Sequence, residues 1–166
     1  MEFGFSLGSN QGDAIANMRE AKRRMLASPD VQWVAQSPLY ETEPVGVAPE
    51  YAALKFINAV LVLEAPCTPS EWLTRLRELE EAMGRQRTGD RNAPRPIDVD
   101  ILYADDQIID RGDLVVPHPR WAERRFVVQP LADVRPDLVL PGAGQTVREI
   151  LAGLQGEAVT RLDTEW

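Results

Sequence analysis

A single α+β domain built on an antiparallel sheet is predicted for this chain of 166 residues. Three observations favour it. The length fits one domain of common size. Several short segments alternate apolar and polar residues, as strands do, and two longer segments repeat apolar residues at helical spacing. With 44% hydrophobic and 27% charged residues, the composition is that of an ordinary globular protein that can bury a core without disulfides.

The first half of the chain predicts three strands and one helix. Phe3, Phe5 and Leu7 share one face of the first strand, because side chains two apart in a strand point the same way. The helix repeats apolar residues from Ile15 to Met25 and ends at Ser28-Pro29-Asp30. The predicted segments are a strand at 2–7, a turn at 8–13, this helix, a strand at 31–40, a loop at 43–53 and a strand at 56–63.

The second half predicts a helix, a strand and two smaller additions. Thr68-Pro69-Ser70-Glu71 has the sequence of a capping box with proline at the first helical position. The helix that follows is expected to bury Trp72, Leu73, Leu76, Leu79 and Met83, and Gly84 ends it. A strand at 95–102 comes next. Residues 107–109 and 114–117 are expected to pair as a hairpin, and 145–154 to form a last helix.

The order strand, helix, strand, strand, helix, strand is that of the split βαβ pattern of ferredoxin-like folds. We therefore expect a ferredoxin-like βαββαβ core with an antiparallel sheet, an added hairpin and a C-terminal helix. The helices are expected to cover one face of the sheet. Residues 1–166 contain no repeat, low-complexity tract or linker, which indicates one domain.

Two carboxylates share one face of the strand at 95–102. Asp98 and Asp100 alternate with Ile97, Val99 and Ile101, so their Cα atoms lie roughly 6.6 Å apart in an extended strand. Aspartate is a poor strand residue, and Mg²⁺ typically takes one or two carboxylates and finds its other ligands in phosphates and water. The pair therefore indicates a metal site. The alternative is a half-buried strand whose polar face meets solvent.

An arginine-rich loop precedes this strand. Residues 84–95 hold four arginines and one aspartate, a local charge of +3 in a chain of net charge −8. Arginine presents a planar fork of donors that fits phosphate oxygens. Loop and strand together predict a site for a metal-bound polyphosphate. A solvated basic loop that pairs with acidic neighbours is the alternative interpretation.

Composition limits the other classes of function. The single cysteine excludes an intrachain disulfide, and one cysteine with one histidine excludes a Cys/His zinc site. The chain shows no long apolar run and no signal-peptide pattern, so we expect a cytoplasmic protein without a membrane partner. A pI near 4.7 argues against nucleic-acid binding.

Four further features allow a functional or a structural interpretation. The turn Gly8–Gly12 lacks the Walker A and dinucleotide patterns, so we expect a strand-to-helix turn with Asn10 or Asp13 near the cap. His118, between two prolines and followed by arginines, either orders its loop or holds phosphate. Asn58, in an apolar strand, needs partners from the backbone or from a ligand. Glu80 is placed to orient an arginine.

The chain resembles the 6-hydroxymethyl-7,8-dihydropterin pyrophosphokinase family from about residue 4 to about residue 141. The motifs that carry the resemblance are Leu7-Gly8-Ser9-Asn10-x-Gly12, Ser37-x-x-Tyr40-x-Thr42-x-Pro44-x-Gly46, Phe56-Ile57-Asn58-Ala59, Gly84-Arg85-x-Arg87, Pro94-Arg95-Pro96-Ile97-Asp98-x-Asp100-Ile101-Leu102, Pro117-His118-Pro119-Arg120 and Arg124-x-Phe126-Val127. The resemblance implies a monomer that transfers the β,γ-diphosphate of ATP to the pterin hydroxymethyl group and releases AMP, with two Mg²⁺ ions.

The resemblance also implies a role for each matching residue. Asp98 and Asp100 would hold the metals, and Asp98 is the nearest acceptor for the hydroxyl proton. Arg85 and Arg95 would be catalytic phosphate ligands. The implied ATP contacts are Arg85, Arg87, Arg95, Ile101, His118 and Arg124. The implied pterin contacts are Thr42, Glu43, Val45, Gly46, Phe56, Asn58 and Phe126.

The sequence departs from the family in the arginine loop and beside the pterin loop. Asn92 and Ala93 stand where the family commonly has Trp-Gly, and Lys55 stands where it often has an acidic residue. Two other classes stay open: another Mg-dependent nucleotidyl or phosphoryl transferase, and a non-catalytic ferredoxin-like ligand-binding module.

Overall fold

The computed structural model describes residues 1–42, 55–85, 95–156 and 158–166. Several of the sequence-based expectations lie outside the described residues: the loop at 43–53, the pterin contacts of Glu43, Val45 and Gly46, the ATP contact of Arg87, and the Asn92-Ala93 departure.

Twelve helices and strands make up the described chain, together with a 3₁₀ turn at Trp121–Glu123. In chain order they are β1 (Glu2–Ser9), α1 (Ala14–Met25), β2 (Gln32–Gln36), β3 (Tyr40–Thr42), β4 (Phe56–Glu64), α2 (Pro69–Ala82), β5 (Asp98–Ala104), β6 (Ile109–Arg111), β7 (Leu114–Val116), α3 (Arg125–Val134), α4 (Val147–Gly153) and β8 (Thr160–Arg161). The predicted hairpin is present as β6 and β7, and the predicted last helix as α4.

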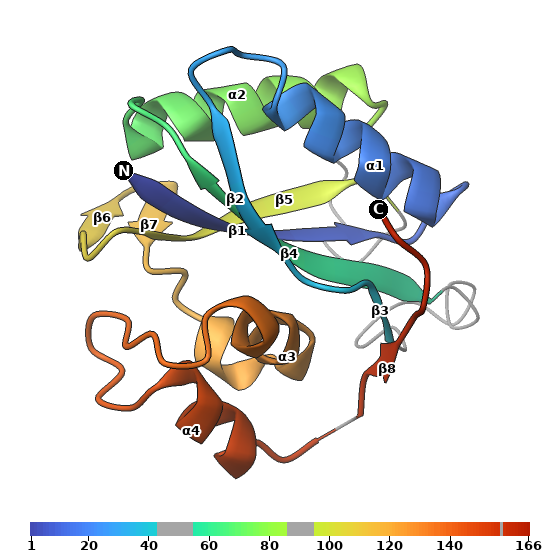
Figure 1. The fold of residues 1–166 in the computed structure, drawn as a ribbon. Coiled ribbons are helices and arrows are strands. Elements are labelled where there is room, and N and C mark those ends of the chain that lie inside the picture. The colour runs from blue at the N-terminus through green and yellow to red at the C-terminus, as the bar shows by residue number, and fades with distance from the viewer. Residues whose placement is uncertain (43–54, 86–94, 157) are drawn as a thin grey trace.

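The main sheet has the order β5-β1-β4-β3-β8, and β2 also pairs with β4. Every pairing in it is antiparallel. The predicted mixed fold with an antiparallel sheet is therefore confirmed, and Figure 1 shows α1 and α2 on one side of the sheet and α3 and α4 on the other.

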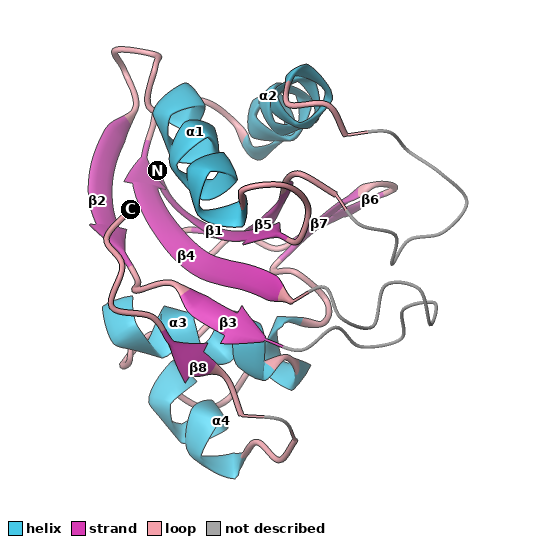
Figure 2. Cartoon of the chain, turned by 90° about the vertical axis from the view of Figure 1, so that its right-hand side faces the viewer, coloured by secondary structure: helices cyan, strands magenta, loops and turns pink. Residues whose placement is uncertain are grey.

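Helices cover both faces of this sheet. Phe3, Phe5 and Leu7 of β1 are fully buried in the core cluster that includes α1 and α2, as their shared face predicted. Val60 and Val62, on the other face of β4, pack with residues of α3 and α4 in a second cluster. Figure 2 shows the resulting three layers. The expectation that helices cover one face is wrong, because α3 was not predicted. Its internal Pro130 obscures the helical pattern.

The strand predicted at 31–40 is two strands, β2 and β3. Ser37 lies at the break, where its backbone N–H donates to the Val60 carbonyl (2.9 Å) and its hydroxyl accepts from the Val60 N–H (2.9 Å). Pro38 follows and has no N–H to continue the ladder. The break redirects the chain, so that β3 continues along β4 toward Phe56.

The N-caps of α1 and α2 are at residues that the sequence predicted. Asp13 caps α1 by accepting from the Ala16 N–H (3.0 Å), and Thr68 caps α2 by accepting from the Glu71 N–H (3.2 Å). Asn10, the other candidate for the first cap, instead accepts from the Arg95 N–H (2.8 Å). This bond links the residue after β1 to Arg95, the first residue of the described range 95–156.

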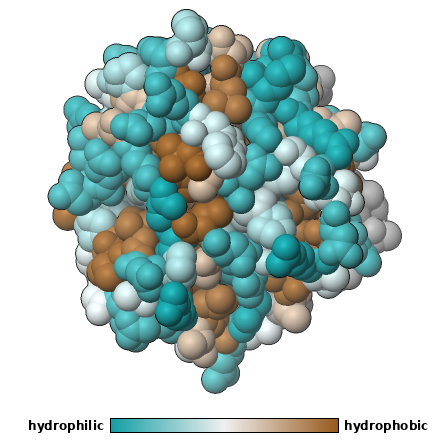
Figure 3. All heavy atoms as spheres, viewed as in Figure 1, coloured by the Kyte–Doolittle hydropathy of each residue, from teal (hydrophilic) through white to brown (hydrophobic). Residues whose placement is uncertain are grey.

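Few large apolar side chains of the described residues are exposed. Figure 3 shows apolar groups separated by hydrophilic side chains on the face it presents. The large exposed apolar residues of the described chain are Trp33, Ile108 and Val139, from three distant segments. No helix in the described ranges is long and apolar enough to cross a membrane.

Tyr40 of β3 joins the sheet to α3 and makes stability depend on pH. Its hydroxyl donates to the Asp133 carboxylate, and burial together with that carboxylate raises the pKa of Tyr40 to about 12. A raised pKa stabilises the fold fully below the unfolded tyrosine value of about 10, and this stabilisation disappears as the pH rises toward the folded value.

We expect Tyr40→Phe to lower the free energy of unfolding near neutral pH by about 1–3 kcal/mol, because a buried hydrogen bond to a carboxylate is lost. The difference in the free energy of unfolding between wild type and variant should become smaller above pH ~10. Urea denaturation near pH 7 and near pH 11 measures both values. A gap that stays constant with pH would contradict the role assigned to the hydroxyl.

Candidate active site

Three central strands place one row of residues at one end of the sheet. Gly8 of β1 is paired with Asn58 of β4 on one side and with Asp98 of β5 on the other. Paired residues point to the same face of a sheet. A Cβ at Gly8 would lie 3.0 Å from Asn58 Oδ1, so glycine keeps the middle of this row open. Asn58 and Asp98 therefore face a shared space above β1.

The next position along the same face carries the second aspartate. Asp100 is paired with Ser6 of β1, two residues from Asp98, as the alternation predicted. Val99, between them, is buried in the core on the opposite face. The two carboxylates thus point away from the α1–α2 core and toward the side of the sheet on which Asn58 lies.

A buried glutamate fixes the arginine beside Asp98. Glu80 of α2 is 4% exposed and accepts from the Val99 N–H (2.9 Å) through Oε1. Its other oxygen, Oε2, accepts from Arg85 Nη1 (2.9 Å), and the same nitrogen donates to Asp98 Oδ1 (2.7 Å). The prediction that Glu80 orients an arginine is confirmed, and the arginine is Arg85.

Asp100 carries negative charge that the described residues leave partly uncompensated. Desolvation of its carboxyl group, followed by the nearby charges of Asp98 and Glu80, raises the pKa of Asp100 to about 7. Arg124 and Arg85 act in the opposite direction on this pKa. A raised pKa at Asp100, beside two like charges, means that a cation or a proton is favoured at this carboxyl group.

His118 lies opposite Asp100. Its Nδ1 accepts from the Arg120 N–H (3.1 Å), so the hydrogen of the neutral ring sits on Nε2, which is 3.8 Å from Asp100 Oδ2. Burial and the charge of Arg124 lower the pKa of His118. A neutral imidazole with a fixed tautomer therefore presents one N–H donor to this side of the site.

Each of the two predicted pterin-stacking rings lies beside an arginine. The guanidinium carbon of Arg95 is 5.6 Å from the centre of the Phe56 ring, and that of Arg124 is 5.7 Å from the centre of the Phe126 ring. These are cation–π contacts of the usual length. Both arginines are predicted phosphate ligands, so the structure brings predicted phosphate and pterin residues into contact.

The remaining predicted residues divide between the site and the core. Asn58 is 5% exposed, and its Nδ2 donates to Thr42 Oγ1 (2.9 Å), which brings these two pterin candidates together. Ile101 is buried in the α1–α2 cluster, on the face of β5 opposite to the aspartates. Its side chain is not part of the charged cluster formed by Glu80, Arg85, Asp98, Asp100 and His118. The contact of Ile101 with the nucleotide stays a prediction.

Two residues of this site were not assigned a role in it from the sequence. Gly8 forms the open middle of the row, and Asn10 joins β1 to Arg95 by two bonds, because its backbone N–H also donates to the Arg95 carbonyl (3.3 Å). Both belong to the segment that the sequence predicted only as a strand-to-helix turn, whereas Gly8 lies within β1. The signal was present in the motif, but the partners of these residues come from distant segments.

The donor set fits a hard divalent cation. Among residues 1–42, 55–85, 95–156 and 158–166, no group of three or more His, Cys, Asp or Glu side chains could hold a metal. The two oxygen donors on one face, Asp98 and Asp100, match Mg²⁺, which takes few protein carboxylates and completes its shell with phosphate and water. They do not match zinc, which prefers four nitrogen or sulfur ligands.

An antiparallel α+β fold with paired carboxylates and arginines at one end of its sheet is typical of an enzyme that handles phosphate groups. Comparison with known proteins gives the family. The family model described as 7,8-dihydro-6-hydroxymethylpterin-pyrophosphokinase (HPPK) matches residues 4–136. The chain therefore belongs to the HPPK family.

Relatives of similar length support this family. A protein of Methylorubrum extorquens named 2-amino-4-hydroxy-6-hydroxymethyldihydropteridine pyrophosphokinase is 38% identical over 157 residues, which are 95% of this chain and 96% of that protein. A protein of the same name from Pseudomonas aeruginosa is 37% identical over 157 residues, which are 95% of this chain and 94% of that protein. A folate synthesis bifunctional protein of Arabidopsis thaliana is 39% identical over 78% of this chain, but only 26% of its own length is matched.

The fold has solved counterparts. The crystal structure of Plasmodium falciparum HPPK-DHPS with pteroate superposes with a TM-score of 0.71 over 91% of this chain and 42% of that chain, at 15% identity. At this identity the likeness concerns the fold alone.

Proposed function

We propose that this pyrophosphokinase of folate synthesis transfers the β,γ-diphosphate of ATP to the hydroxyl group of 6-hydroxymethyl-7,8-dihydropterin and releases AMP. Diphosphate transfer follows from the family and from the names of its full-length relatives. The observation that carries the proposal for this chain is the row Asn58–Gly8–Asp98. It joins a buried amide suited to a heterocycle edge to a carboxylate suited to a metal-bound phosphate.

We propose that Asp98 and Asp100 hold two Mg²⁺ ions. When bound, Mg²⁺ neutralises the negative charge of the triphosphate and aligns its oxygens. The shared face of the two carboxylates and the raised pKa of Asp100 support this assignment. Below a pH of about 7, protonation of Asp100 competes with metal binding, so we expect a higher Mg²⁺ requirement in acid.

The triphosphate ligands would be arginines and one histidine. Glu80 holds Arg85 beside Asp98, and Asn10 anchors the backbone of Arg95. His118 Nε2 lies 3.8 Å from Asp100 Oδ2, and the charge of Arg124 acts on the pKa of both groups. Bidentate arginine contacts position phosphate and stabilise the charge that develops on the leaving AMP. Phosphoryl-type transfer requires mostly such positioning and charge neutralisation.

The pterin would lie between Phe56 and Phe126, with its amide-bearing edge at Asn58. Phosphates that draw Arg95 and Arg124 toward themselves would expose the ring faces that these arginines now cover. The pterin hydroxyl oxygen attacks the β-phosphorus, and the bond from that phosphorus to the α–β bridging oxygen breaks. The hydroxyl proton passes to Asp98 or to solvent, and AMP carries away the bridging oxygen.

We also infer that the core is ferredoxin-like and forms one domain. The supporting observation is the antiparallel order β5-β1-β4 with β2 and β3 on the outer side of β4. This is the order in which a split βαβ pattern folds.

The nucleotide product distinguishes the proposal from its alternatives. Incubated with ATP, Mg²⁺ and the reduced pterin, the protein should form AMP and pterin diphosphate in equal amounts. A nucleotidyl transferase would release pyrophosphate, and a simple kinase would release ADP. Separation of the nucleotides by ion-exchange chromatography, with a control that lacks pterin, decides between them. Formation of AMP without pterin diphosphate would contradict the assigned acceptor.

A further inference from the structure

We propose that the C-terminal segment 160–166 positions the pterin side of the site by holding β3 in place, an inference that rests on the proposed function. We call this segment the C-terminal strap. It leaves the α4 side of the molecule, follows the outer edge of the sheet and ends against α1, as Figure 2 shows. It contains no residue of the charged cluster, so its effect on the reaction would be indirect.

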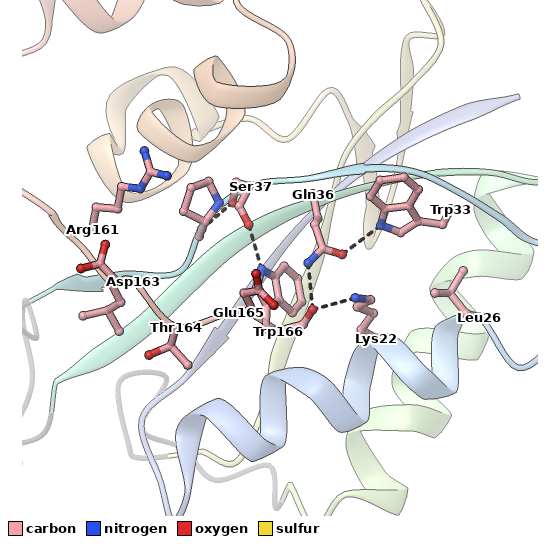
Figure 4. Close-up of a pocket in the computed structure, with 12 residues that line it drawn as sticks. Lys22, Leu26, Trp33, Gln36, Ser37, Arg161, Asp163, Thr164, Glu165 and Trp166 are labelled. Carbon is pink, nitrogen blue, oxygen red and sulfur yellow. Dashed lines mark hydrogen bonds between the residues drawn. The ribbon is translucent and has the colours of Figure 1, made fainter.

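The end of the strap is anchored at Trp166. Its indole Nε1–H donates to the Ser37 carbonyl (2.8 Å), and its backbone oxygen accepts from Lys22 Nζ (2.8 Å) and Gln36 Nε2 (2.9 Å). Lys22 Nζ also lies 5.5 Å from the centre of the indole ring. Figure 4 shows these groups converging from α1, from β2 and from the strap itself. Three donors and one ring contact fix this end to both β2 and α1.

The middle of the strap pairs with β3. Arg161 is paired with Tyr40 and Thr160 with Glu41, and the Leu162 N–H donates to the Leu39 carbonyl (2.9 Å). With the bond from Trp166 to Ser37, the strap contacts the chain continuously from the break between β2 and β3 to the middle of β3. It therefore covers the outer edge of β3, whose other partner among the described strands is β4.

β3 is a weak element without this cover. It has three residues and pairs with β4 at three positions, whereas strands of globular proteins are usually longer. An exposed edge strand of this length frays readily. The strap supplies the second row of partners, and the Tyr40–Asp133 hydrogen bond supplies a third contact.

The last residue of β3 reaches the pterin candidates. Thr42 accepts from Asn58 Nδ2 and is paired with Phe56, so a displaced β3 would release the Asn58 amide and disturb the neighbourhood of the Phe56 ring. The phosphate candidates Asp98, Asp100 and Arg85 depend on β1, β5 and α2 instead. Loss of the strap should therefore weaken pterin binding and leave ATP binding largely unchanged.

The test compares Trp166→Phe and a chain that lacks residues 160–166 with wild type. Trp166→Phe keeps an aromatic ring and removes the Nε1–H donor. For the shortened chain we expect the KM for the pterin to rise about tenfold, the effect of losing one hydrogen bond of about 1.4 kcal/mol. The phenylalanine variant should show a smaller rise. The KM for ATP and the kcat at saturating pterin should stay within about twofold of wild type.

Thr164→Ala is the matched control, because Thr164 belongs to the strap but is exposed. It should behave as wild type. An unchanged pterin KM in the shortened chain, or an equal rise in both KM values, would overturn the proposal. If the shortened chain does not fold, Trp166→Phe decides by the same criteria.

Hydrogen exchange separates this inference from the proposed function. Amides of β3 should exchange faster in Trp166→Phe than in wild type, while those of β1 should not change. This measurement needs no activity. If wild type forms no pterin diphosphate, the proposed function fails whatever β3 does, and if β3 exchange is unchanged in an active enzyme, the strap proposal alone fails.

Discussion

Replacing Asp98 or Asp100 by alanine should abolish turnover and leave the fold intact. Each carboxylate would hold the metal that neutralises the triphosphate, and loss of such stabilisation costs orders of magnitude in rate, about 10³-fold or more. Asp100→Ala should not lower stability, because desolvation and the like charges of Asp98 and Glu80 disfavour the charged form of this carboxyl group in the folded protein. At Asp98, the partly exposed ion pair with Arg85 adds at most about 1 kcal/mol.

Rates of AMP formation at limiting and saturating Mg²⁺, together with thermal denaturation, test this expectation. Asp110→Ala, on the exposed hairpin strand β6, is the control and should match wild type in both. A variant of Asp98 or Asp100 with near-normal turnover at limiting Mg²⁺ would remove that residue from the metal site.

The largest loss of stability is expected from Glu80→Ala. Glu80 is buried, and its removal takes away the acceptor of the Val99 N–H and one of the two carboxylates, Glu80 and Asp98, that pair with Arg85. Removing one partner of a buried ion pair costs about 3–5 kcal/mol. The KM for ATP should also rise, because Arg85 is no longer fixed beside Asp98.

Glu80→Gln separates the two contributions. Its amide oxygen can still accept from Val99, so stability should recover in part, whereas the charge that orients Arg85 is absent and the KM for ATP should stay high. Urea denaturation and initial-rate kinetics give both quantities. Glu81→Ala, at the exposed neighbouring position, is the control. Full recovery of ATP affinity in Glu80→Gln would show that the negative charge does not orient Arg85.

Sequence patterns within one segment correctly predicted features that are determined within that segment, such as the shared face of a strand or the first turn of a helix. The common face of Asp98 and Asp100 follows from the period of a strand, and the first turn of α2 follows from Thr68 and Pro69. The break at Ser37 was missed because its cause is a pair of bonds to Val60, 23 residues away. Helix α3 was missed because Pro130 interrupts its sequence signal.

The site was predictable as a set of residue types but not as an arrangement. Family motifs gave the names of the charged and aromatic candidates, yet the row Asn58–Gly8–Asp98 arises from strands that are 50 and 90 residues apart in sequence. The apolar and polar pattern of a single strand does not show which distant strands pair with it. The strap was missed for the same reason, since residues 158–166 have no repeating apolar pattern and acquire their structure from β3 and α1.

The row Asn58–Gly8–Asp98 also fixes the distance between the backbones of Asn58 and Asp98. Asn58 and Asp98 are separated by one intervening strand, and neighbouring strands lie about 4.8 Å apart, so their backbones are about 10 Å apart. Backbone hydrogen bonds set this interval, and side-chain substitutions leave it unchanged. On the proposed roles, a heterocycle held at Asn58 presents its hydroxyl to phosphate held at Asp98 only if the arm between ring and oxygen has the right number of carbons. Selectivity for a one-carbon arm would then originate in the spacing of the sheet.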